Sequence, residues 1–145
     1  MAKLVLMAEA TGKQPIIVTH LGGMQFCAEV RGHRIVVDQP TKVGGTDSAP
    51  TPIELLTSSL GCCVAFYVQQ FCRSRSLPYQ GMSVEVTPQT TAGRIDRFTV
   101  RVVMPEPLPT RETELLERVA RSCPAHGTLA HGADIAIGIE VPVTT

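Results

Sequence analysis

The chain has 145 residues, of which 43% are hydrophobic and 18% are charged. Thirteen basic and thirteen acidic side chains give a formal net charge of zero, which argues against a protein that coats phosphate backbones or anionic membranes. We therefore expect no nucleic-acid partner. A chain of this length can bury a hydrophobic core without disulfide staples, so we predict a single domain over residues 1–145.

Targeting signals and cysteine content point to the cytoplasm. Residues 1–9 contain a short apolar run that Glu9 interrupts, and we read no signal peptide in them. The longest apolar run, residues 60–68, is less than half of what a membrane-spanning helix needs, so we expect no membrane partner. In a reducing compartment, an odd set of five cysteines is not a disulfide framework. The cysteines are either small buried hydrophobes or reactive thiols.

The first forty residues have the pattern of strands. Residues 16–18 are β-branched, and residues 24–30 alternate loosely before a turn leads into residues 34–38. This order predicts an antiparallel meander, with Asp38 as a strand-end residue. Residues 39–51 are rich in Pro, Gly, Thr, Asp and Ser, which predicts a loop.

A long helix is predicted to begin at Pro52. Thr51 can cap it, Pro fits its first position, and Glu54 can close a capping box. We expect the helix to reach about Ser76, before Leu77-Pro78 ends it. A helix that is apolar nearly all round is buried on most sides, either at the centre of a domain or in a subunit interface.

The second half of the chain adds strands and a shorter helix. Residues 83–87 and 94–103 alternate polar and apolar positions, which predicts a hairpin. Thr110 is expected to cap an amphipathic helix that stops at Cys123-Pro124, because the residue before a proline is disfavoured in a helix.

A short helical turn through Leu129 and a final strand over residues 133–143 complete the predicted order of elements. Strands, a long helix, strands, a helix and a strand make the fold class α+β.

Three cysteines are candidates for chemistry. Cys62 and Cys63 follow Gly61 in mid-helix, where glycine costs about 1 kcal/mol relative to alanine and suggests a close approach of another element. Both cysteines are equally well interpreted as core residues, since free cysteine is among the most buried residue types. Cys123, beside a proline at a helix end, is a poor position for a core-filling side chain and a reasonable one for a resolving thiol.

A zinc site is the weaker interpretation of the same region. The ligands would come from Cys123, His126, His131, Cys62 and Cys63, but adjacent cysteines chelate poorly and the chain has no Cys-x-x-Cys pair. We expect no metal and no other cofactor.

The motifs resemble a known family. Residues 52–63, which include Gly61-Cys62-Cys63, are followed some sixty residues later by Cys123-Pro124 and preceded by Gly22-Gly23-Met24. This arrangement is similar to the family of osmotically inducible protein C and organic hydroperoxide resistance proteins. The resemblance implies an OsmC-like fold, with antiparallel sheets around a long buried helix. It also implies an intertwined homodimer with a thiol peroxidase site at the subunit boundary.

The resemblance also implies roles for two residues. Cys63 would attack an organic hydroperoxide and become a sulfenic acid, and Cys123 would condense with it to a disulfide that an external dithiol reduces. A thiol in a buried site needs a positive neighbour to remain a thiolate, because burial raises its pKa.

The chain departs from the family pattern at the expected charged partners. Met24 and Ile53 stand where the peroxidases have an arginine and a glutamate, and Glu54 is the adjacent acidic residue. Met24, Ile53 and Glu54 are therefore candidate substrate-binding residues, and Arg31 or Arg34 remains open as a substitute for the arginine. The apolar replacements favour an alternative function, a non-catalytic dimer that binds a hydrophobic small molecule between subunits.

Overall fold

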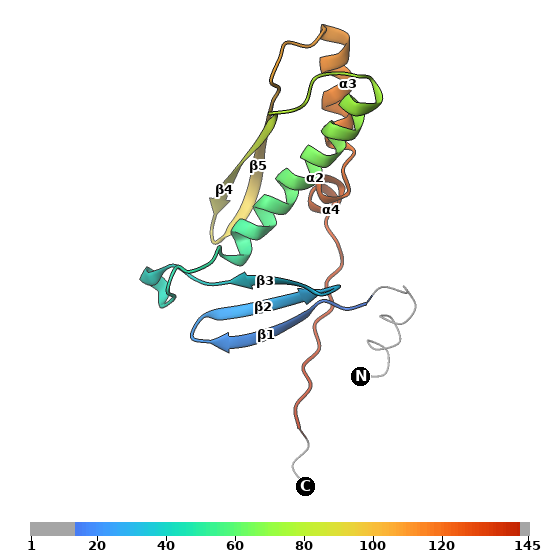
Figure 1. The fold of residues 1–145 in the computed structure, drawn as a ribbon. Coiled ribbons are helices and arrows are strands. Elements are labelled where there is room, and N and C mark those ends of the chain that lie inside the picture. Colours follow the sequence, from blue (N-terminus) through green and yellow to red (C-terminus); the bar gives the residue numbers. More distant parts are fainter. Residues whose placement is uncertain (1–13, 143–145) are drawn as a thin grey trace. The chain divides into compact units, whose positions relative to one another are not determined.

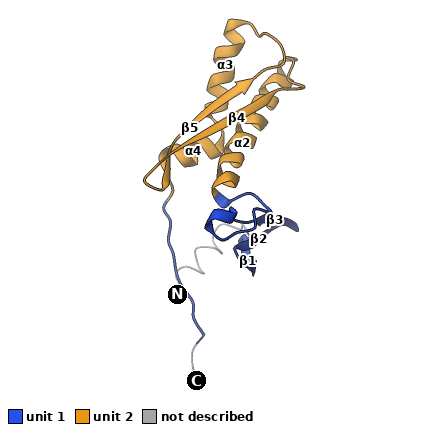
Figure 2. Ribbon diagram, turned by 90° about the vertical axis from the view of Figure 1, so that its left-hand side faces the viewer, with its two compact units in different colours: residues 1–52, 134–145 blue, residues 53–133 orange. Residues whose placement is uncertain are grey.

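The computed structural model describes residues 14–142 and contains antiparallel strands and helices, which confirms the α+β class (Figure 1). Two compact units divide the chain, one made of residues 1–52 and 134–145 and one made of residues 53–133 (Figure 2). The predicted absence of a signal peptide concerns residues outside the described range. Each unit is built around its own antiparallel sheet.

The first unit contains the predicted meander. Strands β1 (Ile17–Gly22), β2 (Gln25–Val30) and β3 (His33–Val37) form a sheet in the order β1-β2-β3. Cys27 of β2 lies opposite Thr19 on one side and Val36 on the other. The two connecting turns are tight, because both contain residues with positive φ.

The loop after β3 is held together by one carboxylate. Asp38 is only 1% exposed, and its side chain accepts hydrogen bonds from Gln39, Thr46 and Ser48. These donors, with the Thr46 side chain foremost, lower the pKa of the Asp38 carboxyl well below its usual range. Asp38 is therefore the structural residue that the sequence predicted, and the 3-10 helix η1 (Thr41–Val43) sits inside the loop that it anchors.

The second unit packs a hairpin over helices. Helix α2 (Pro52–Ser74) begins at the predicted proline, and the hairpin consists of β4 (Ser83–Thr91) and β5 (Arg94–Val103). Helices α3 (Thr110–Arg121) and α4 (Pro124–His131) follow. The hairpin covers α2 and α3 (Figure 1), and apolar side chains of both strands contact the buried cluster of these helices.

Helix α2 buries one face rather than most of its surface. The buried residues are Leu60, Gly61, Val64, Val68 and Cys72, whose spacing follows a single helical stripe. Exposed apolar side chains remain elsewhere on the helix, including Phe66 at 54%. Of the two predicted settings for this helix, the centre of a domain is therefore wrong within one chain, and a subunit interface stays a prediction.

The glycine in mid-helix has the predicted cause. A Cβ atom at position 61 would lie 3.0 Å from Cγ2 of Val86 on β4. Glycine therefore lets α2 approach the hairpin closely, and this packing compensates for its low helix propensity.

The described residues include one candidate membrane span. One helix, α2, is long and apolar enough to cross a membrane by length and composition, with a mean hydropathy of 1.3 in its most apolar window. The core helix of a globular protein meets the same criterion, so this finding is weak evidence for a membrane protein.

Two local predictions need correction. Thr110 does not cap α3, because Pro109 occupies the N-cap position and Thr110 is the first helical residue. The predicted final strand is absent over its described part, since residues 133–142 have no regular secondary structure and Val143 lies outside the description. Its alternating apolar side chains are 75–85% exposed, at Ile135, Ile137, Ile139 and Val141. A strand needs a neighbour for its backbone hydrogen bonds, and no such pairing is formed by this segment.

The loop anchored by Asp38 predicts a strict requirement at Gly45. A Cβ atom there would overlap the backbone of Gln39. We expect Gly45→Ala to lower the free energy of unfolding by about 1–3 kcal/mol, measured by urea denaturation. The matched control is Gly127→Ala in α4, where an added Cβ meets no atom within 4 Å. Equal stabilities of the two variants would contradict the packing described for this loop.

Candidate functional site

Two distant cysteines lie next to each other in the second unit. Cys63 of α2 is partly buried and packs against the buried cluster that contains Cys123, whose exposure is 1%. The Cys63 thiol is near enough to Cys123 to raise the pKa of Cys123. The fold thus joins residues that are sixty positions apart in the sequence. The expectation that Cys123 is poorly placed for the core was wrong, because its thiol is both a core side chain and the neighbour of Cys63.

Cys123 also caps helix α4. It has an extended backbone, with φ −68° and ψ 142°, and Pro124 follows at the first helical position. Its Sγ accepts a hydrogen bond from the backbone N–H of His126 at 3.2 Å. A residue before a proline is driven into the extended conformation that an N-cap requires. The Cys-Pro pair is therefore a sequence signal for the N-cap of α4. Only the end of the preceding helix was predicted from this pair.

Opposing effects set the acidity of the Cys123 thiol. Burial raises its pKa above the usual value, and the Cys63 thiol raises it further. The backbone N–H groups of His126 and Ala125 act in the opposite direction. Cys123 therefore rests as a protonated thiol whose Sγ already accepts a hydrogen bond from the His126 N–H.

The other three cysteines lie in different surroundings. Cys27 and Cys72 are fully buried, and burial raises the pKa of the Cys72 thiol. Cys62 is exposed. Adjacent residues on a helix point about 100° apart, so Cys62 and Cys63 face different surroundings although they are neighbours in sequence.

The remaining candidate residues divide between the two units, since Ile53 and Glu54 share the second unit with Cys63 and Met24 does not. Met24 lies in the first unit, in the turn between β1 and β2, and is 43% exposed. Ile53 and Glu54 are exposed residues in the first turn of α2. Because α2 rises about 1.5 Å per residue, Ile53 is about 15 Å along the helix from Cys63.

The two arginines considered as substitutes are in the first unit. Arg34 interacts with the Cys27 thiol, which raises the pKa of Arg34, and forms an ion pair with Glu29 at 3.4 Å. Arg31 is an exposed turn residue with φ 49°. Both arginines are therefore placed on the three-stranded sheet, as surface residues.

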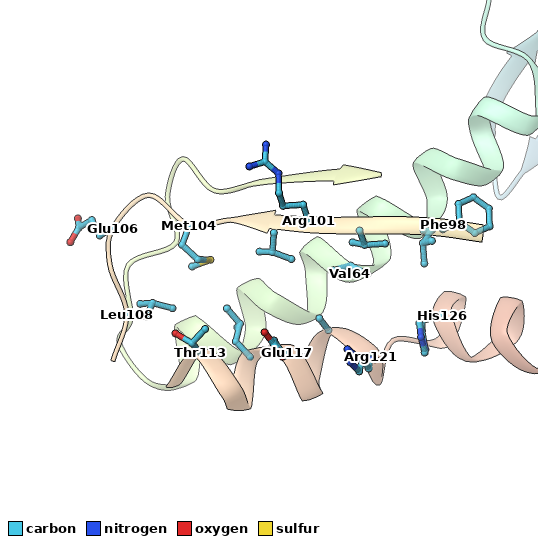
Figure 3. A pocket seen from close by; sticks show the side chains of 15 residues that line it. Val64, Phe98, Arg101, Met104, Glu106, Leu108, Thr113, Glu117, Arg121 and His126 are labelled. Atoms are coloured by element: carbon cyan, nitrogen blue, oxygen red, sulfur yellow. The ribbon is translucent and has the colours of Figure 1, made fainter. Parts of the chain in front are cut away.

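A cavity of about 670 Å³ opens beside the buried cluster, between β5 and helices α2 and α3 (Figure 3). Leu60, Val64 and Leu116 belong both to its wall and to the cluster that contains Cys123. The Arg101 guanidinium points away from the cavity (Figure 3) and pairs with Glu85 at 2.6 Å. The lining is mixed, because apolar side chains of α2, β5 and α3 are joined by Glu106, Thr113, Glu117, Arg121 and His126. Neither Cys63 nor Cys123 is among the lining residues.

A second cavity of about 480 Å³ continues along β5. It shares Leu60, Phe98, Val100 and His126 with the first cavity and includes Ile53. The sequence interpretation missed both cavities. The only signal was the apolar stripe on α3, which predicts a buried face but does not reveal space left in front of it.

The described residues form no ligand set for the zinc site considered from the sequence. Within residues 14–142, no three side chains from His, Cys, Asp and Glu are grouped closely enough to hold a metal ion. His126 contributes its backbone N–H to Cys123 and its side chain to the cavity walls.

Comparisons with known proteins point to one family. The family model described as OsmC-like protein matches residues 45–138, which is more than half of the chain. A comparison with curated proteins finds no match.

Solved structures with a similar fold include proteins from three bacteria. A protein assigned to osmotic stress and detoxification responses in Psychrobacter arcticus 273-4 has a TM-score of 0.74 and 22% identity, covering 81% of this chain and 89% of its own. An OsmC-like protein of Mycoplasma pneumoniae has a TM-score of 0.69 and 18% identity, covering 83% and 89%. An organic hydroperoxide resistance protein OsmC of Legionella pneumophila has a TM-score of 0.53 and 19% identity, covering 80% and 89%. At such low identities these likenesses establish the fold alone.

The contact between the thiols predicts that Cys63 controls the acidity of Cys123. We expect Cys63→Ala to lower the pKa of Cys123, because both interactions with Cys63 raise it while the amide donors remain. The pH dependence of Cys123 alkylation, followed by peptide mass spectrometry, measures this shift. Cys62→Ala is the matched control and is expected to leave the Cys123 pKa unchanged. An unchanged or higher pKa in Cys63→Ala would contradict the contact.

Proposed function

The chain belongs to the OsmC-like protein family, and we propose that it reduces organic hydroperoxides with Cys63 as the attacking thiol and Cys123 as the resolving thiol. The observation that carries this proposal is the contact between the two thiols in an apolar cluster. A two-cysteine mechanism requires neighbouring thiols, because the resolving thiol must reach the sulfenic acid to close a disulfide.

The proposed reaction has three balanced steps. The Cys63 thiolate attacks one peroxide oxygen, the O–O bond breaks, and the alkoxide leaves with a proton as an alcohol. This leaves Cys63 as a sulfenic acid. The Cys123 sulfur then attacks the Cys63 sulfur, water leaves, and a disulfide forms. An external dithiol returns both cysteines to thiols and becomes a disulfide itself.

The surroundings favour hydrophobic substrates. Leu60, Val64 and Leu116 contribute apolar surface both to the cavity of about 670 Å³ and to the cluster around Cys123, and the second cavity continues along β5. Apolar surface of this kind binds alkyl or aryl groups better than it binds hydrogen peroxide. An organic hydroperoxide is therefore the substrate class that we propose.

The cavities also support a second candidate function. The same cavities, together with the apolar residues Met24 and Ile53 at the family's charged positions, support a non-catalytic dimer that binds a hydrophobic small molecule. In this alternative the thiols are structural.

We also propose that the protein is a homodimer and that it works in the cytoplasm. Two apolar surfaces support the dimer, namely the exposed side chains on α2 and the extended segment with Ile135, Ile137 and Ile139, which are 83–85% exposed. Exposed apolar surface of this extent marks interaction sites. Five free cysteines fit the reducing conditions of the cytoplasm.

The peroxidase proposal predicts a specific pattern of variants. With cumene hydroperoxide and dithiothreitol, we expect Cys63→Ser to lower turnover at least about 100-fold, because a serine hydroxyl is a poor nucleophile at neutral pH. Cys123→Ser is expected to consume about one equivalent of peroxide and to stall as a sulfenic acid. Cys62→Ser is the matched control and should retain turnover. Equal and negligible rates for the unmodified protein and all variants would exclude peroxidase activity and favour the ligand-binding alternative.

The dimer predicts a sedimentation result. We expect the protein to sediment as a dimer at micromolar concentration. Phe66→Glu should shift it to a monomer, because a charge would replace an apolar contact on α2. Arg111→Glu changes an exposed residue that is already charged and serves as the control. A monomeric unmodified protein at this concentration would refute the dimer.

A further inference from the structure

The two sulfurs of the thiol pair differ in how easily another molecule can reach them. Within one chain, Cys123 is 1% exposed, whereas Cys63 retains partial exposure on α2. In thiol–disulfide exchange, the attacking thiolate approaches one sulfur and expels the other, so the rate depends on access to the attacked sulfur. An incoming thiol can therefore approach Cys63 more easily than Cys123.

The two sulfurs also differ in what stabilises a negative charge. Cys123 is the N-cap of α4, and the His126 N–H already points at its Sγ from 3.2 Å. The N-terminus of a helix carries a partial positive charge and stabilises thiolates. Such fixed donors stabilise charge that develops during a reaction without further reorganisation.

The state of Cys63 affects how strongly the backbone N–H groups can stabilise a negative charge on Cys123. In the reduced protein, burial and the Cys63 thiol oppose ionisation of Cys123. Once Cys63 is bonded to another sulfur, it is no longer an ionisable neighbour. The opposition from Cys63 is then lost, and the backbone donors remain.

We propose that the thiol which reduces the Cys63–Cys123 disulfide attacks Sγ of Cys63 and expels Cys123 as the leaving thiolate at the N-terminus of α4. The first attack forms a mixed disulfide between the reductant and Cys63. A second thiol then attacks the reductant sulfur of that mixed disulfide, which releases Cys63 as a thiolate and leaves the reductant oxidised. Two electrons pass from two reductant thiols to the protein, and their two protons end on Cys63 and Cys123. This inference rests on the disulfide of the proposed mechanism and assigns its two sulfurs different roles.

The test maps the site of the first attack. A Cys62→Ala protein, which lacks the exposed neighbouring thiol, is oxidised with diamide so that no peroxidase activity is needed. It is then mixed with reduced glutathione, quenched with acid and alkylated with N-ethylmaleimide. Peptide mass spectrometry should find glutathione on Cys63 about tenfold more often than on Cys123, with Cys123 alkylated. Equal labelling, or more glutathione on Cys123, would overturn the proposal.

A second measurement isolates the backbone donor. In the same diamide-oxidised background, His126→Pro removes the N–H that donates to Cys123, while proline is tolerated in the first helical turn. His126→Ala keeps this N–H and removes only the imidazole. We expect the proline variant to react with glutathione roughly tenfold more slowly than the alanine variant, since a hydrogen bond to a charged group is lost. Equal rates in two folded variants would overturn the role of the donor. The mapping experiment does not depend on either variant folding.

These outcomes separate the inference from the proposed function. Glutathione on Cys63 in a protein without peroxide turnover would leave the inference standing and refute the peroxidase. Peroxide turnover together with glutathione on Cys123 would support the peroxidase and overturn the inference. If diamide forms no Cys63–Cys123 disulfide, the inference is overturned directly.

Discussion

The close approach of α2 to the β4–β5 hairpin is the packing constraint on which the candidate site depends. A Cβ atom at Gly61 would meet Val86 at 3.0 Å, so the two elements lie at a separation that only a glycine allows without a shift. Cys63 is two residues further along the helix, and its neighbour Val64 is buried in the cluster on the same face as Gly61. The position of the Cys63 thiol beside Cys123 therefore follows from backbone packing in the interior of α2.

Cys123 meets two demands that oppose each other. As a core side chain it is removed from water, which stabilises the neutral thiol. As the N-cap of α4 it needs to accept a hydrogen bond, which favours the thiolate. A buried alanine would satisfy only the first demand and a serine only the second. This combination explains how one residue can be inert at rest and still have donors ready for a negative charge.

Local signals predicted much of the fold, whereas contacts between distant segments were not accessible. The start of α2 at Pro52 and the hairpins follow from residues within a few positions of each element. Thr110 shows the limit of such signals, because the preceding proline took the N-cap position. The burial of Cys123 was mispredicted, since it depends on side chains of α2 that are sixty residues away. The pairing with Cys63 came from a family resemblance and from no periodicity in the chain.

The two largest disagreements with the sequence predictions have one physical explanation in the proposed dimer. Helix α2 is apolar on faces that a single chain leaves exposed, and the segment around Ile137 has the alternation of a strand without the neighbour that a strand needs. Both patterns are typical of surfaces that are buried against another molecule. A second copy of the chain offers an apolar helix face and sheet edges at once. The sequence patterns are therefore consistent with burial in an assembly, and a subunit interface is one of the two settings that the sequence predicted for α2.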